Sequence, residues 1–575
     1  MSGNGSRQKE LSIDAIEQML DSEIETRLQF IRRLENSPIE KVISSGEVLG
    51  PLNLIDHDGH HQFLETKGYY SRFRKGDNVQ IRISGDSNSS EHLFDTTVHD
   101  LTYPSEGKLC ISIGNSRKEK LDSHTEYFIY PTENEFLHNK LKDCILSCDR
   151  SLYRNRISPQ LDSKKVPSKF LDRLNSSQIE AFNFLSSSET DAAVQGPPGT
   201  GKTQLLLALV AQALACNLSV GIAAFTHAAV DNALSRIANL DVKHTFCRVG
   251  RSEMIKRELY PQNWLHGRTA KSFGSIKGYR PQLFASTTHS WALSPAAPKV
   301  DLLIIDEAGQ VPVYFMPVLL STGYKIFCLG DHKQLPPVLQ GDHSGTVEHT
   351  DIFSQFLSKH SPMLEIQYRM NSQIQAWPST QFYGGRLQPH LSNQNRDVLS
   401  TFNGPKNYLG RRPLQLITHK KYGNSSTNLA EASLVAELVD RLFKVTEYLP
   451  ANQIGIISPK RMHNGAINQA LQSKFGVVVA SQIHVDTVER FQGQEREVIL
   501  FSFGSDRRAP AEDEISFIGD AQRLNVAITR ARSRFYCFAT EELASLREAS
   551  IEDKQDALPG FFASFAKKNR PKQNK

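Results

Sequence analysis

The chain contains 575 residues, of which 22% are charged, and its formal net charge is +5. This length exceeds what a single hydrophobic core usually organises, so about three or four domains are expected. The net charge is too small to indicate a nucleic-acid partner by itself. Runs of about 18 apolar residues are absent from the sequence, which argues against a membrane partner.

The predicted secondary structure changes twice within the amino-terminal third of the chain. Apolar residues recur at helical spacing within residues 1–41 and predict a long amphipathic helix there. From 42 to 131, short β-rich runs are broken by Gly, Asp and Asn, a pattern typical of a small accessory β-barrel. Residues 132–164 again have a helical pattern and predict a connecting helix. The barrel is therefore expected to lie between helices.

The cysteines and the first residues bear on the compartment. Seven cysteines are few and scattered at this length, which is typical of a reducing compartment. Cys144 and Cys148 could share a helix face, but no second Cys/His pair stands nearby to complete a zinc site, so core packing is favoured. The first residues lack the layout of a signal peptide. A cytoplasmic location is expected, or a nuclear one in a eukaryote.

A phosphate-binding loop is predicted at "GPPGTGKT", residues 196–203. It lies between an apolar stretch typical of a buried strand and a helix-forming stretch, which is the order that a P-loop requires. Lys202 would reach the β- and γ-phosphates, and Thr203 would offer its hydroxyl to Mg²⁺. The glycines predicted to shape the loop are Gly196, Gly199 and Gly201. The alternative is an ordinary Gly/Pro turn.

Further polar residues follow predicted strands. Asp306 and Glu307 come directly after the apolar run "LLII", where one carboxylate can hold Mg²⁺ and the other can orient the attacking water. Gln334 follows the next strand, and its amide could bridge the γ-phosphate and a domain interface. Arg369 and Arg530 have the chemistry that stabilises charge on a transferred phosphoryl group. Taken singly, each also fits a solvated loop or a salt bridge.

Strands alternate with helices beyond residue 165, which predicts an α/β fold with parallel sheets. A second such series begins near "PLQLIT" and continues to "SRFYCFA". The predicted divisions are 165–355 for the first α/β domain, with a short insertion near 252–283, and 356–548 for the second. Residues 549–575 form a basic tail, for which a solubilising role is favoured over added affinity for nucleic acid.

Taken together, the motifs resemble those of the superfamily 1 helicases. The similar branch contains the helicase of nonsense-mediated mRNA decay, the senataxin-type helicases and the nuclease-helicase of Okazaki fragments. The matching segments, in the family's order, are "LNSSQ" (174–178), "GPPGTGKT" (196–203), "FTHAAVDNAL" (225–234), "DEAGQ" (306–310), "GDHKQLPP" (330–337), "QYRM" (367–370), "IGIISP" (454–459), "TVERFQGQE" (487–495) and "LNVAITRAR" (524–532).

The resemblance implies two tandem RecA-like P-loop domains that use ATP and Mg²⁺. It implies that Gln178 reads the adenine edge, Tyr368 stacks on the base and Glu495 contacts the ribose. Thr226 is the implied contact to the nucleic-acid backbone. The implied phosphate, magnesium and water site of the first domain comprises Lys202, Thr203, Asp306, Glu307 and Gln334, and the arginines reaching it from the second domain are Arg369 and Arg530.

Two features depart from the family pattern. Glu489 stands where an Asp is usual, a change that is expected to be tolerated. The insertion between residues 251 and 284 is short. Contacts with nucleic acid that a longer insertion makes in larger relatives are therefore not expected for this chain. No zinc-rich regulatory domain or nuclease domain is recognised.

The barrel segment "KGYYSRFRKGDNVQIRI" interleaves aromatic and basic residues. Such a mixture can stack bases and hold phosphates, but the aromatics can equally be barrel core and the charges a solvated rim. The residues proposed for nucleic-acid binding are Tyr69, Tyr70, Arg72 and Arg74.

The leading hypothesis is a monomeric ATP-dependent helicase or translocase acting on single-stranded DNA or RNA, with 5′-to-3′ polarity implied by the resemblance alone. The rival is an ATP-gated nucleic-acid clamp or scaffold that works with a partner and does not unwind. A P-loop kinase or GTPase is less well supported, because it leaves the second strand-helix series unexplained.

Overall fold

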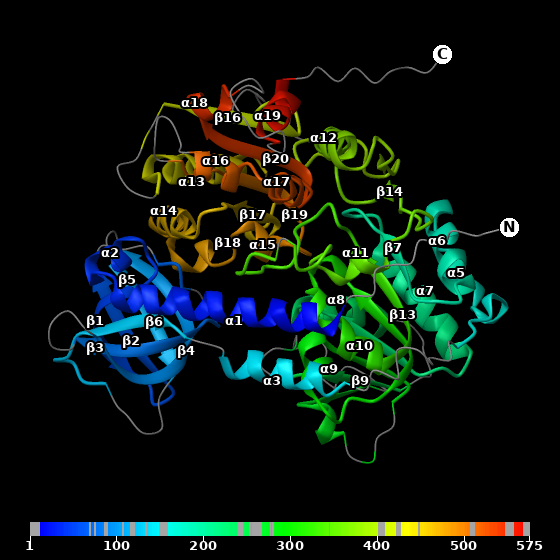
Figure 1. The fold of residues 1–575 in the computed structure, drawn as a ribbon. Coiled ribbons are helices and arrows are strands. Elements are labelled where there is room, and N and C mark those ends of the chain that lie inside the picture. Colours follow the sequence, from blue (N-terminus) through cyan, green and yellow to red (C-terminus); the bar gives the residue numbers. More distant parts are fainter. Residues whose placement is uncertain are drawn as a thin grey trace. The chain divides into compact units, whose positions relative to one another are not determined.

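The structure is a computed structural model, and it describes residues 12–67, 71–73, 76–84, 90–105, 108–114, 121–132, 135–148, 159–238, 245–251, 255, 267–276, 278, 281–343, 345–400, 409–420, 422, 427–446, 449–505, 512–546 and 557–566. It divides into two compact units (Figure 1). The first comprises Met1–Arg27 and Asn134–Tyr368, and the second comprises Leu28–Glu133 and Arg369–Lys575. Helix α1 (Ile13–Asn36) therefore contributes to both units.

The first unit is built on a seven-stranded parallel sheet with the order β10-β9-β11-β8-β12-β13-β7. Its strands are β7 (Ala192–Gln195), β8 (Val220–Ala224), β9 (Phe246–Val249), β10 (Gly267–Ala270), β11 (Leu283–Thr287), β12 (Val300–Asp306) and β13 (Gly323–Gly330). Its helices besides α1 are α3 (Glu135–Leu146), α5 (Ser168–Leu171), α6 (Ser176–Ser187), α7 (Lys202–Ala215), α8 (His227–Ala238), α9 (Thr288–Leu293), α10 (Met316–Thr322) and α11 (Ile352–Phe356).

Both faces of this sheet are covered, as the apolar run in β12 requires. Leu302 and Ile304 join one buried cluster with residues of α6 and α7, whereas Leu303 and Ile305 join another with residues of α1, α3, α9 and α10. Alternate side chains of a strand point to opposite faces, so an uninterrupted apolar run needs helices on both sides. Because helices cover both faces of the sheet, polar loops can gather only at its edges, and the carboxyl ends of the strands form one such edge.

The second unit contains a five-stranded sheet with the order β16-β20-β19-β17-β18, also parallel. Its strands are β16 (Leu414–His419), β17 (Ile454–Ile457), β18 (His484–Asp486), β19 (Arg496–Ser502) and β20 (Ala531–Thr540). Its helices are α2 (Ile39–Ser44), α12 (Ser372–Phe382), α13 (Leu429–Val445), α14 (Arg461–Ala480), α15 (Val488–Phe491), α16 (Glu512–Ile518), α17 (Ala521–Ile528), α18 (Glu541–Ala544) and α19 (Leu558–Ala566).

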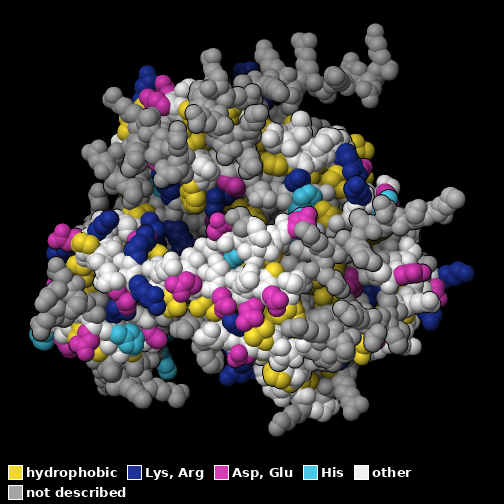
Figure 2. All heavy atoms as spheres, viewed as in Figure 1, with side chains coloured by type: hydrophobic (Ala, Val, Ile, Leu, Met, Phe, Trp, Pro, Cys, Tyr) yellow, Lys and Arg dark blue, Asp and Glu magenta, His cyan; other side chains and the backbone are white. Residues whose placement is uncertain are grey.

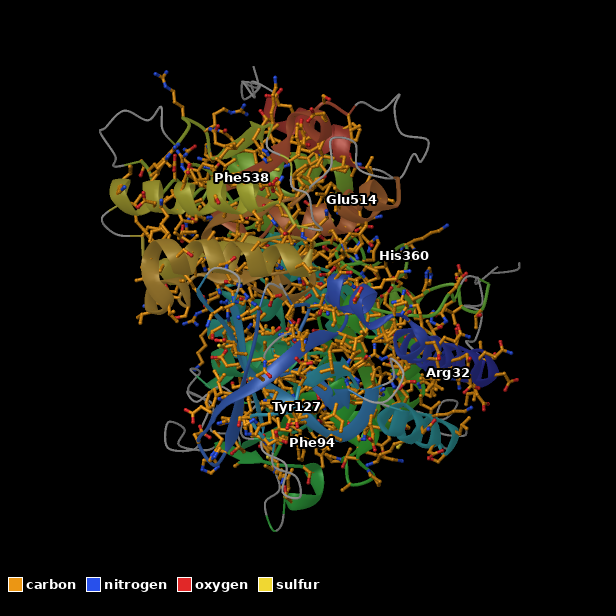
Figure 3. The ribbon with its side chains drawn as sticks, turned by 90° about the vertical axis from the view of Figure 1, so that its left-hand side faces the viewer. Arg32, Phe94, Tyr127, His360, Glu514 and Phe538 are labelled. Atoms are coloured by element: carbon orange, nitrogen blue, oxygen red, sulfur yellow. The ribbon has the colours of Figure 1, made fainter. Side chains whose placement is uncertain are left out.

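The same unit holds a closed barrel of six antiparallel strands in the order β1-β2-β5-β4-β3-β6. The strands are β1 (Leu49–His57), β2 (His61–Lys67), β3 (Asn78–Ser84), β4 (Ser90–Ser105), β5 (Lys108–Gly114) and β6 (Tyr127–Pro131). Figure 3 labels two of its buried side chains, Phe94 and Tyr127, and also Phe538 from the core of the five-stranded sheet. Strand β4 contacts α14, so the barrel packs against the α/β part of its own unit.

The divisions differ in three places from those expected from the sequence. The units separate after Tyr368 instead of after residue 355. The segment that includes β14 (Ile366–Gln367) is tied to the first unit, because the N–H of Leu364 donates to the Gln195 carbonyl oxygen and that of Tyr368 donates to the Gly199 carbonyl oxygen. The barrel is grouped with the second α/β unit and not set apart. Within the expected insertion, β10 is an edge strand of the main sheet, paired with β9.

Several expected features fall outside the described residues. These are Tyr69, Tyr70 and Arg74 of the barrel segment and, in the expected tail 549–575, residues 549–556 and 567–575. The rest of that tail differs from the expectation, because Leu558–Ala566 form α19 and Phe561 is fully buried. In the part of the chain that is described, none of the helices is both long enough and apolar enough to cross a membrane.

Candidate active site

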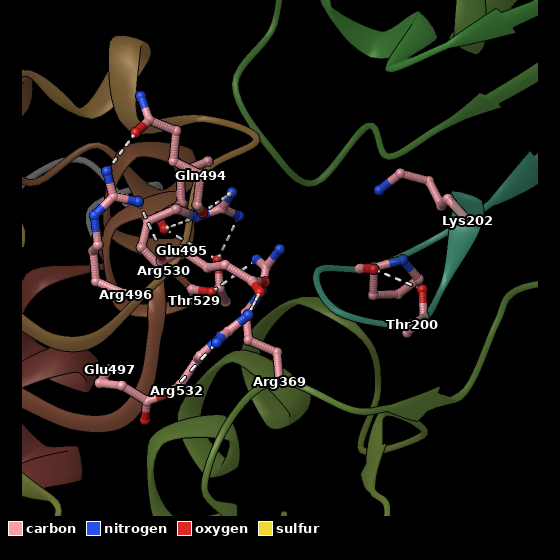
Figure 4. A network of polar contacts seen from close by, with 12 residues as sticks. Thr200, Lys202, Arg369, Gln494, Glu495, Arg496, Glu497, Thr529, Arg530 and Arg532 are labelled. Atoms are coloured by element: carbon pink, nitrogen blue, oxygen red, sulfur yellow. Dashed lines mark hydrogen bonds and ion pairs between the residues drawn. The ribbon is translucent and has the colours of Figure 1, made fainter. Parts of the chain in front are cut away.

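The loop between β7 and α7 has the backbone geometry of a phosphate cradle. Gly199 and Gly201 adopt φ angles of 76° and 81°, in the left-handed region that L side chains rarely enter. A Cβ atom at Gly196 would lie 2.2 Å from Cγ of Lys202, so only glycine fits beside this lysine. The Thr200 hydroxyl donates to the Pro197 carbonyl oxygen at 2.7 Å and closes the loop on itself (Figure 4). The predicted P-loop thus has the predicted strand, turn and helix context.

Lys202 begins α7 and bridges two parts of the site. Its Nζ donates to the carbonyl oxygen of Gly196 at 2.8 Å and lies 3.6 Å from Oε1 of Glu307. Its side chain is only 11% exposed. The two oxygens hold the ammonium over the loop, where phosphate oxygens could be its partners.

Asp306 and Glu307 lie at the carboxyl end of β12. Burial raises the pKa of Asp306 to about 7, the Glu307 carboxylate adds to that rise, and the Lys202 ammonium opposes it. A buried acid with a raised pKa is a site where a bound cation would be strongly favoured. Glu307 has a φ of 51°, an unusual value for a residue with a side chain. Such strain at a polar rim is typical of functional positions.

The topology of the sheet brings the predicted loops together. Strand β13 pairs with both β12 and β7, so the DEAG loop, the GDHKQ loop and the P-loop begin at three adjacent carboxyl ends. At the end of β13, Asp331 accepts from Nε2 of Gln334 at 2.9 Å and from Nε2 of Gln195 at 3.0 Å. Gln334 is buried and held by this carboxylate, so Asp331 is a positioning residue that the motif reading quoted but did not single out.

The side-chain amide of Gln178 forms hydrogen bonds with backbone groups of the protein. Its Oε1 accepts from the Asn175 N–H at 3.0 Å, within a capping box that begins α6, and its Nε2 donates to the Thr200 carbonyl oxygen at 2.8 Å. Nε2 also lies 2.4 Å from where a Cβ of Gly201 would be. Gln178 therefore braces the P-loop, and reading an adenine edge would require part of this arrangement to open.

Tyr368 ends the first unit beside these residues. Its backbone N–H donates to the Gly199 carbonyl oxygen at 2.9 Å, and its hydroxyl accepts from Nδ2 of Asn175 at 3.0 Å. The side chain is 40% exposed. An exposed ring next to the P-loop and to α6 is suited to stacking on a base.

In the second unit, Glu495 lies between two arginines (Figure 4). It accepts from Nε of Arg369 and from NH2 of Arg532, and Arg369 also donates to the Thr529 carbonyl oxygen at 3.1 Å. Burial alone would raise the pKa of Glu495, but the two guanidiniums outweigh burial and lower the pKa to about 2. Arg532, which the motif reading did not single out, also donates to Glu497 at 3.4 Å. Glu495 is ionised and engaged on both oxygens.

Arg530 is almost entirely buried, with 2% of its surface exposed. Its Nε donates to the Val526 carbonyl oxygen at 2.9 Å, NH1 donates to the Gln494 carbonyl oxygen at 3.4 Å, and NH2 donates to the Thr529 hydroxyl at 3.0 Å. The structure thus places this predicted arginine finger inside its own unit. A nucleotide-contacting role requires the guanidinium to leave these oxygens.

Thr226 follows β8, on the same carboxyl rim of the first sheet. It is exposed, and its hydroxyl accepts from the Ala229 N–H at 3.2 Å at the start of α8. Beneath it, Nε of the buried Arg248 donates to Asp231 at 2.7 Å, and NH2 lies 3.0 Å from Nδ1 of His227. Through Asp231 and His227, Arg248 holds the first two turns of α8, the helix that directly follows Thr226. Asp231 stands within the quoted "FTHAAVD" segment, but no sequence signal joined it to Arg248.

Mg²⁺ would be held by few protein ligands. Among the described residues, no group of three or more His, Cys, Asp or Glu side chains is arranged to bind a metal ion. Asp306 is nevertheless a buried carboxylate at the end of β12, and the half-buried Thr203 stands in the first turn of α7 after β7; both strands pair with β13, so the two residues belong to the same rim of the sheet. An acid and a hydroxyl beside a phosphate cradle fit a magnesium ion that takes its other oxygens from phosphates and water.

Two family profiles, each described as "AAA domain", match residues 173–360 and 349–542. The chain is 28% identical over 443 residues to "DNA replication ATP-dependent helicase/nuclease DNA2" of Xenopus laevis, covering 70% of this chain and 41% of that protein. It is 28% identical to the protein of the same name from Homo sapiens, covering 70% and 40%. The chain thus spans about two fifths of the length of these curated relatives.

The similarity to "DNA polymerase alpha-associated DNA helicase A" of Schizosaccharomyces pombe is lower but longer, 23% over 619 residues, and covers 90% of both chains. Among solved structures, "Complex structure of Arterivirus nonstructural protein 10 (helicase) with DNA" aligns with 12% identity and a TM-score of 0.38, over 87% of this chain and 78% of that one. This score lies below the level at which a common fold follows.

Proposed function

Because the chain belongs to the superfamily 1 helicases, in the branch that includes the Okazaki-fragment nuclease-helicase and the helicase of nonsense-mediated mRNA decay, we propose that it is an ATP-dependent DNA helicase or translocase. Its proposed substrate is single-stranded DNA, which the names of the similar DNA helicases favour over RNA. The 5′-to-3′ polarity rests on family resemblance. We further propose that the chain acts as a monomer.

The observation that carries this proposal is the arrangement around Lys202. Its ammonium lies between the P-loop carbonyl of Gly196 and the Glu307 carboxylate, next to the buried Asp306. When ATP binds, we expect Lys202 to exchange these oxygens for the β- and γ-phosphates. Glu307, freed from Lys202, would then orient the attacking water and accept its proton.

Asp306 and Thr203 would hold Mg²⁺, which supplies charge neutralisation to the phosphates. Gln334 would contact the γ-phosphate from the position that Asp331 fixes. These residues belong to the first unit and form the hydrolytic half of the proposed site.

The proposed contribution of the second unit is positive charge for the transition state. Arg369 is 13% exposed and is held by the Glu495 carboxylate, so a nucleotide that binds Glu495 through its ribose would change the restraint on Arg369. Arg530 would follow only after leaving the Val526 and Gln494 carbonyl oxygens. We propose that closure of the two units on ATP provides both changes, which couples hydrolysis to movement on the strand.

The decisive test is ATP hydrolysis by the purified chain with and without an oligo-dT strand, with a matched oligo-rU strand as the comparison. Stimulation by dT that exceeds stimulation by rU supports the proposal. No stimulation by either strand would overturn it. A Lys202→Ala variant serves as the hydrolysis-deficient control.

The rival function, an ATP-gated clamp, depends on the same ATP-binding residues. A duplex with a 5′ single-stranded tail and one with a 3′ tail separate the two. Strand displacement that requires ATP and the 5′ tail supports the helicase, whereas ATP-dependent binding with no displacement supports the clamp.

A further inference from the structure

Three arginines from separate segments of the second unit converge near one acid, Glu47. Arg33 comes from the last turns of α1, Arg72 from the segment between β2 and β3, and Arg461 is the first residue of α14. Glu47 Oε1 lies 2.7 Å from NH2 of Arg33 and 3.5 Å from NH1 of Arg72. We call Arg33, Arg72 and Arg461 the arginine cluster.

The turn at Gly46 brings the barrel side and α14 together. A Cβ atom at Gly46 would lie 3.3 Å from Cγ of Arg72 and 3.1 Å from the sulfur of Met462, the residue after Arg461. The Arg72 N–H also donates to the Gly46 carbonyl oxygen at 3.4 Å. A backbone hydrogen bond therefore holds Arg72 beside Gly46, and the Met462 side chain brings the start of α14 to the same turn.

The charges of the cluster do not balance. Arg33 and Arg72 share the one carboxylate of Glu47, and Arg461 adds a third positive charge that acts on Arg72; within the described part of the chain no hydrogen bond or ion pair is formed by Arg461. Burial lowers the pKa of Arg72; Glu47 opposes this, and the like charges of Arg461 and Arg33 lower the pKa further. Mutual repulsion of this kind is relieved when an anion binds among the guanidiniums.

The cluster also remains accessible to a large ligand. The Arg33 and Arg72 side chains are 57% and 45% exposed, and Arg461 is an exposed residue. Figure 2 shows Lys and Arg side chains gathered on the surface where α2 and α14 lie in Figure 1. The barrel contacts α14 next to this surface.

We propose that the arginine cluster binds the phosphate backbone of single-stranded nucleic acid, and that Glu47 acts as an internal competitor which holds the cluster together when no strand is bound. This assignment rests on the proposed function and names a surface for its substrate. A guanidinium carries five N–H donors, and Glu47 engages few of them, so phosphates can bind while Glu47 stays in place.

Arg82, a buried arginine of the same region, does not belong to the arginine cluster. Arg82 is 8% exposed and donates to Glu35 and Gln80, so it links α1 to the barrel without facing solvent. The cluster, in contrast, offers charge from three elements on one surface. Each phosphate that it neutralises should release counterions and contribute to the salt dependence of binding.

The test measures binding of a fluorescent oligo-dT strand, without ATP, over a range of salt concentrations. Arg461→Gln should weaken binding roughly 3- to 10-fold and reduce the slope of log K against log salt by about 0.7. Arg72→Gln should do the same. Glu47→Gln should instead tighten binding, because it removes the competing charge. The matched control is Lys444→Gln on α13, which removes an exposed positive charge that is paired with Asp440.

A failure of the cluster assignment and a failure of the proposed function give different results in this test. If the parent chain binds dT but Arg461→Gln and Arg72→Gln both leave affinity and slope at the Lys444→Gln values, the cluster assignment is wrong while the helicase proposal stands. If the parent binds neither dT nor a matched rU strand, the proposed function itself fails. Equal losses on dT and rU are expected, since phosphates are common to both strands. Glu47→Gln binding more weakly than the parent would overturn the competitor role.

Discussion

Replacing Glu495 by Gln should destabilise the second unit, because the charge of this residue holds two arginines together. The pKa of Glu495 falls from an ordinary 4.5 to about 2. A shift of this size corresponds to about 3 kcal/mol at neutral pH, since one pKa unit is about 1.4 kcal/mol. The side chain is 31% exposed, so solvent screening reduces the expected loss to about 1–2 kcal/mol.

The pH dependence of this loss has a definite sign. A carboxylate whose pKa is lowered by folding stabilises the protein above its unfolded pKa, and this stabilisation is lost as the pH falls through the folded value. The difference between the parent and Glu495→Gln should thus be full at pH 7, reduced by roughly a quarter at pH 4 and reduced by more than half at pH 3. It should disappear near pH 2.

Urea unfolding followed by the fluorescence of Trp377 measures this difference. Trp377 lies buried on α12 of the second unit, and it becomes the single reporter after Trp264→Phe and Trp291→Phe. Glu541→Gln is the control, because Glu541 pairs only loosely with an exposed lysine and should cost under about 0.5 kcal/mol. A Glu495→Gln effect as small as the control, or one that is constant between pH 7 and pH 3, would refute the reasoning.

Three further predictions concern the first unit. Lys202→Ala should lower ATP turnover by roughly 10²–10³-fold or more while shifting the melting temperature by less than about 4 °C, as followed by a phosphate-release assay and calorimetry; substantial residual turnover would exclude the proposed phosphate contact. Gly201→Ala should weaken binding of a fluorescent ATP analogue, because its Cβ would strike Gln178 at a φ of 81°, and unaltered affinity would contradict this. Asp231→Ala should cost about 3–5 kcal/mol in urea unfolding by stranding the buried Arg248, whereas Asp231→Leu combined with Arg248→Met should recover much of the loss; equal losses in both variants would show that packing, not charge, is responsible.

Local sequence was sufficient to predict at which strand ends the residues of the proposed hydrolytic half stand. The P-loop, the acids after "LLII" and Gln334 each follow an apolar strand, and parallel strands present their carboxyl ends on one rim. The short β-rich runs between residues 42 and 131 likewise correspond to six strands of a closed barrel. In these cases the pattern within one segment carries the information.

The partners of the site residues could not be predicted in the same way. Asp331 positions Gln334 together with Gln195, which is distant in the chain, and Glu495 is shared by Arg369 and Arg532. An arginine motif looks the same whether its guanidinium is exposed or, like that of Arg530, donates to backbone oxygens. Only the fold decides which acceptors surround a long side chain.

The sequence by itself therefore determined which chemical groups this protein carries and at which strand ends they stand, because apolar periodicity and glycine-rich turns act over a few residues. The tertiary structure decided which of these groups meet. It braced Gln178 against the P-loop, buried Arg530 and gathered Arg33, Arg72 and Arg461 around Glu47. Electrostatic and hydrogen-bonding partners depend on distances in space between segments far apart in the chain, and those distances exist only after the sheets and the barrel have packed.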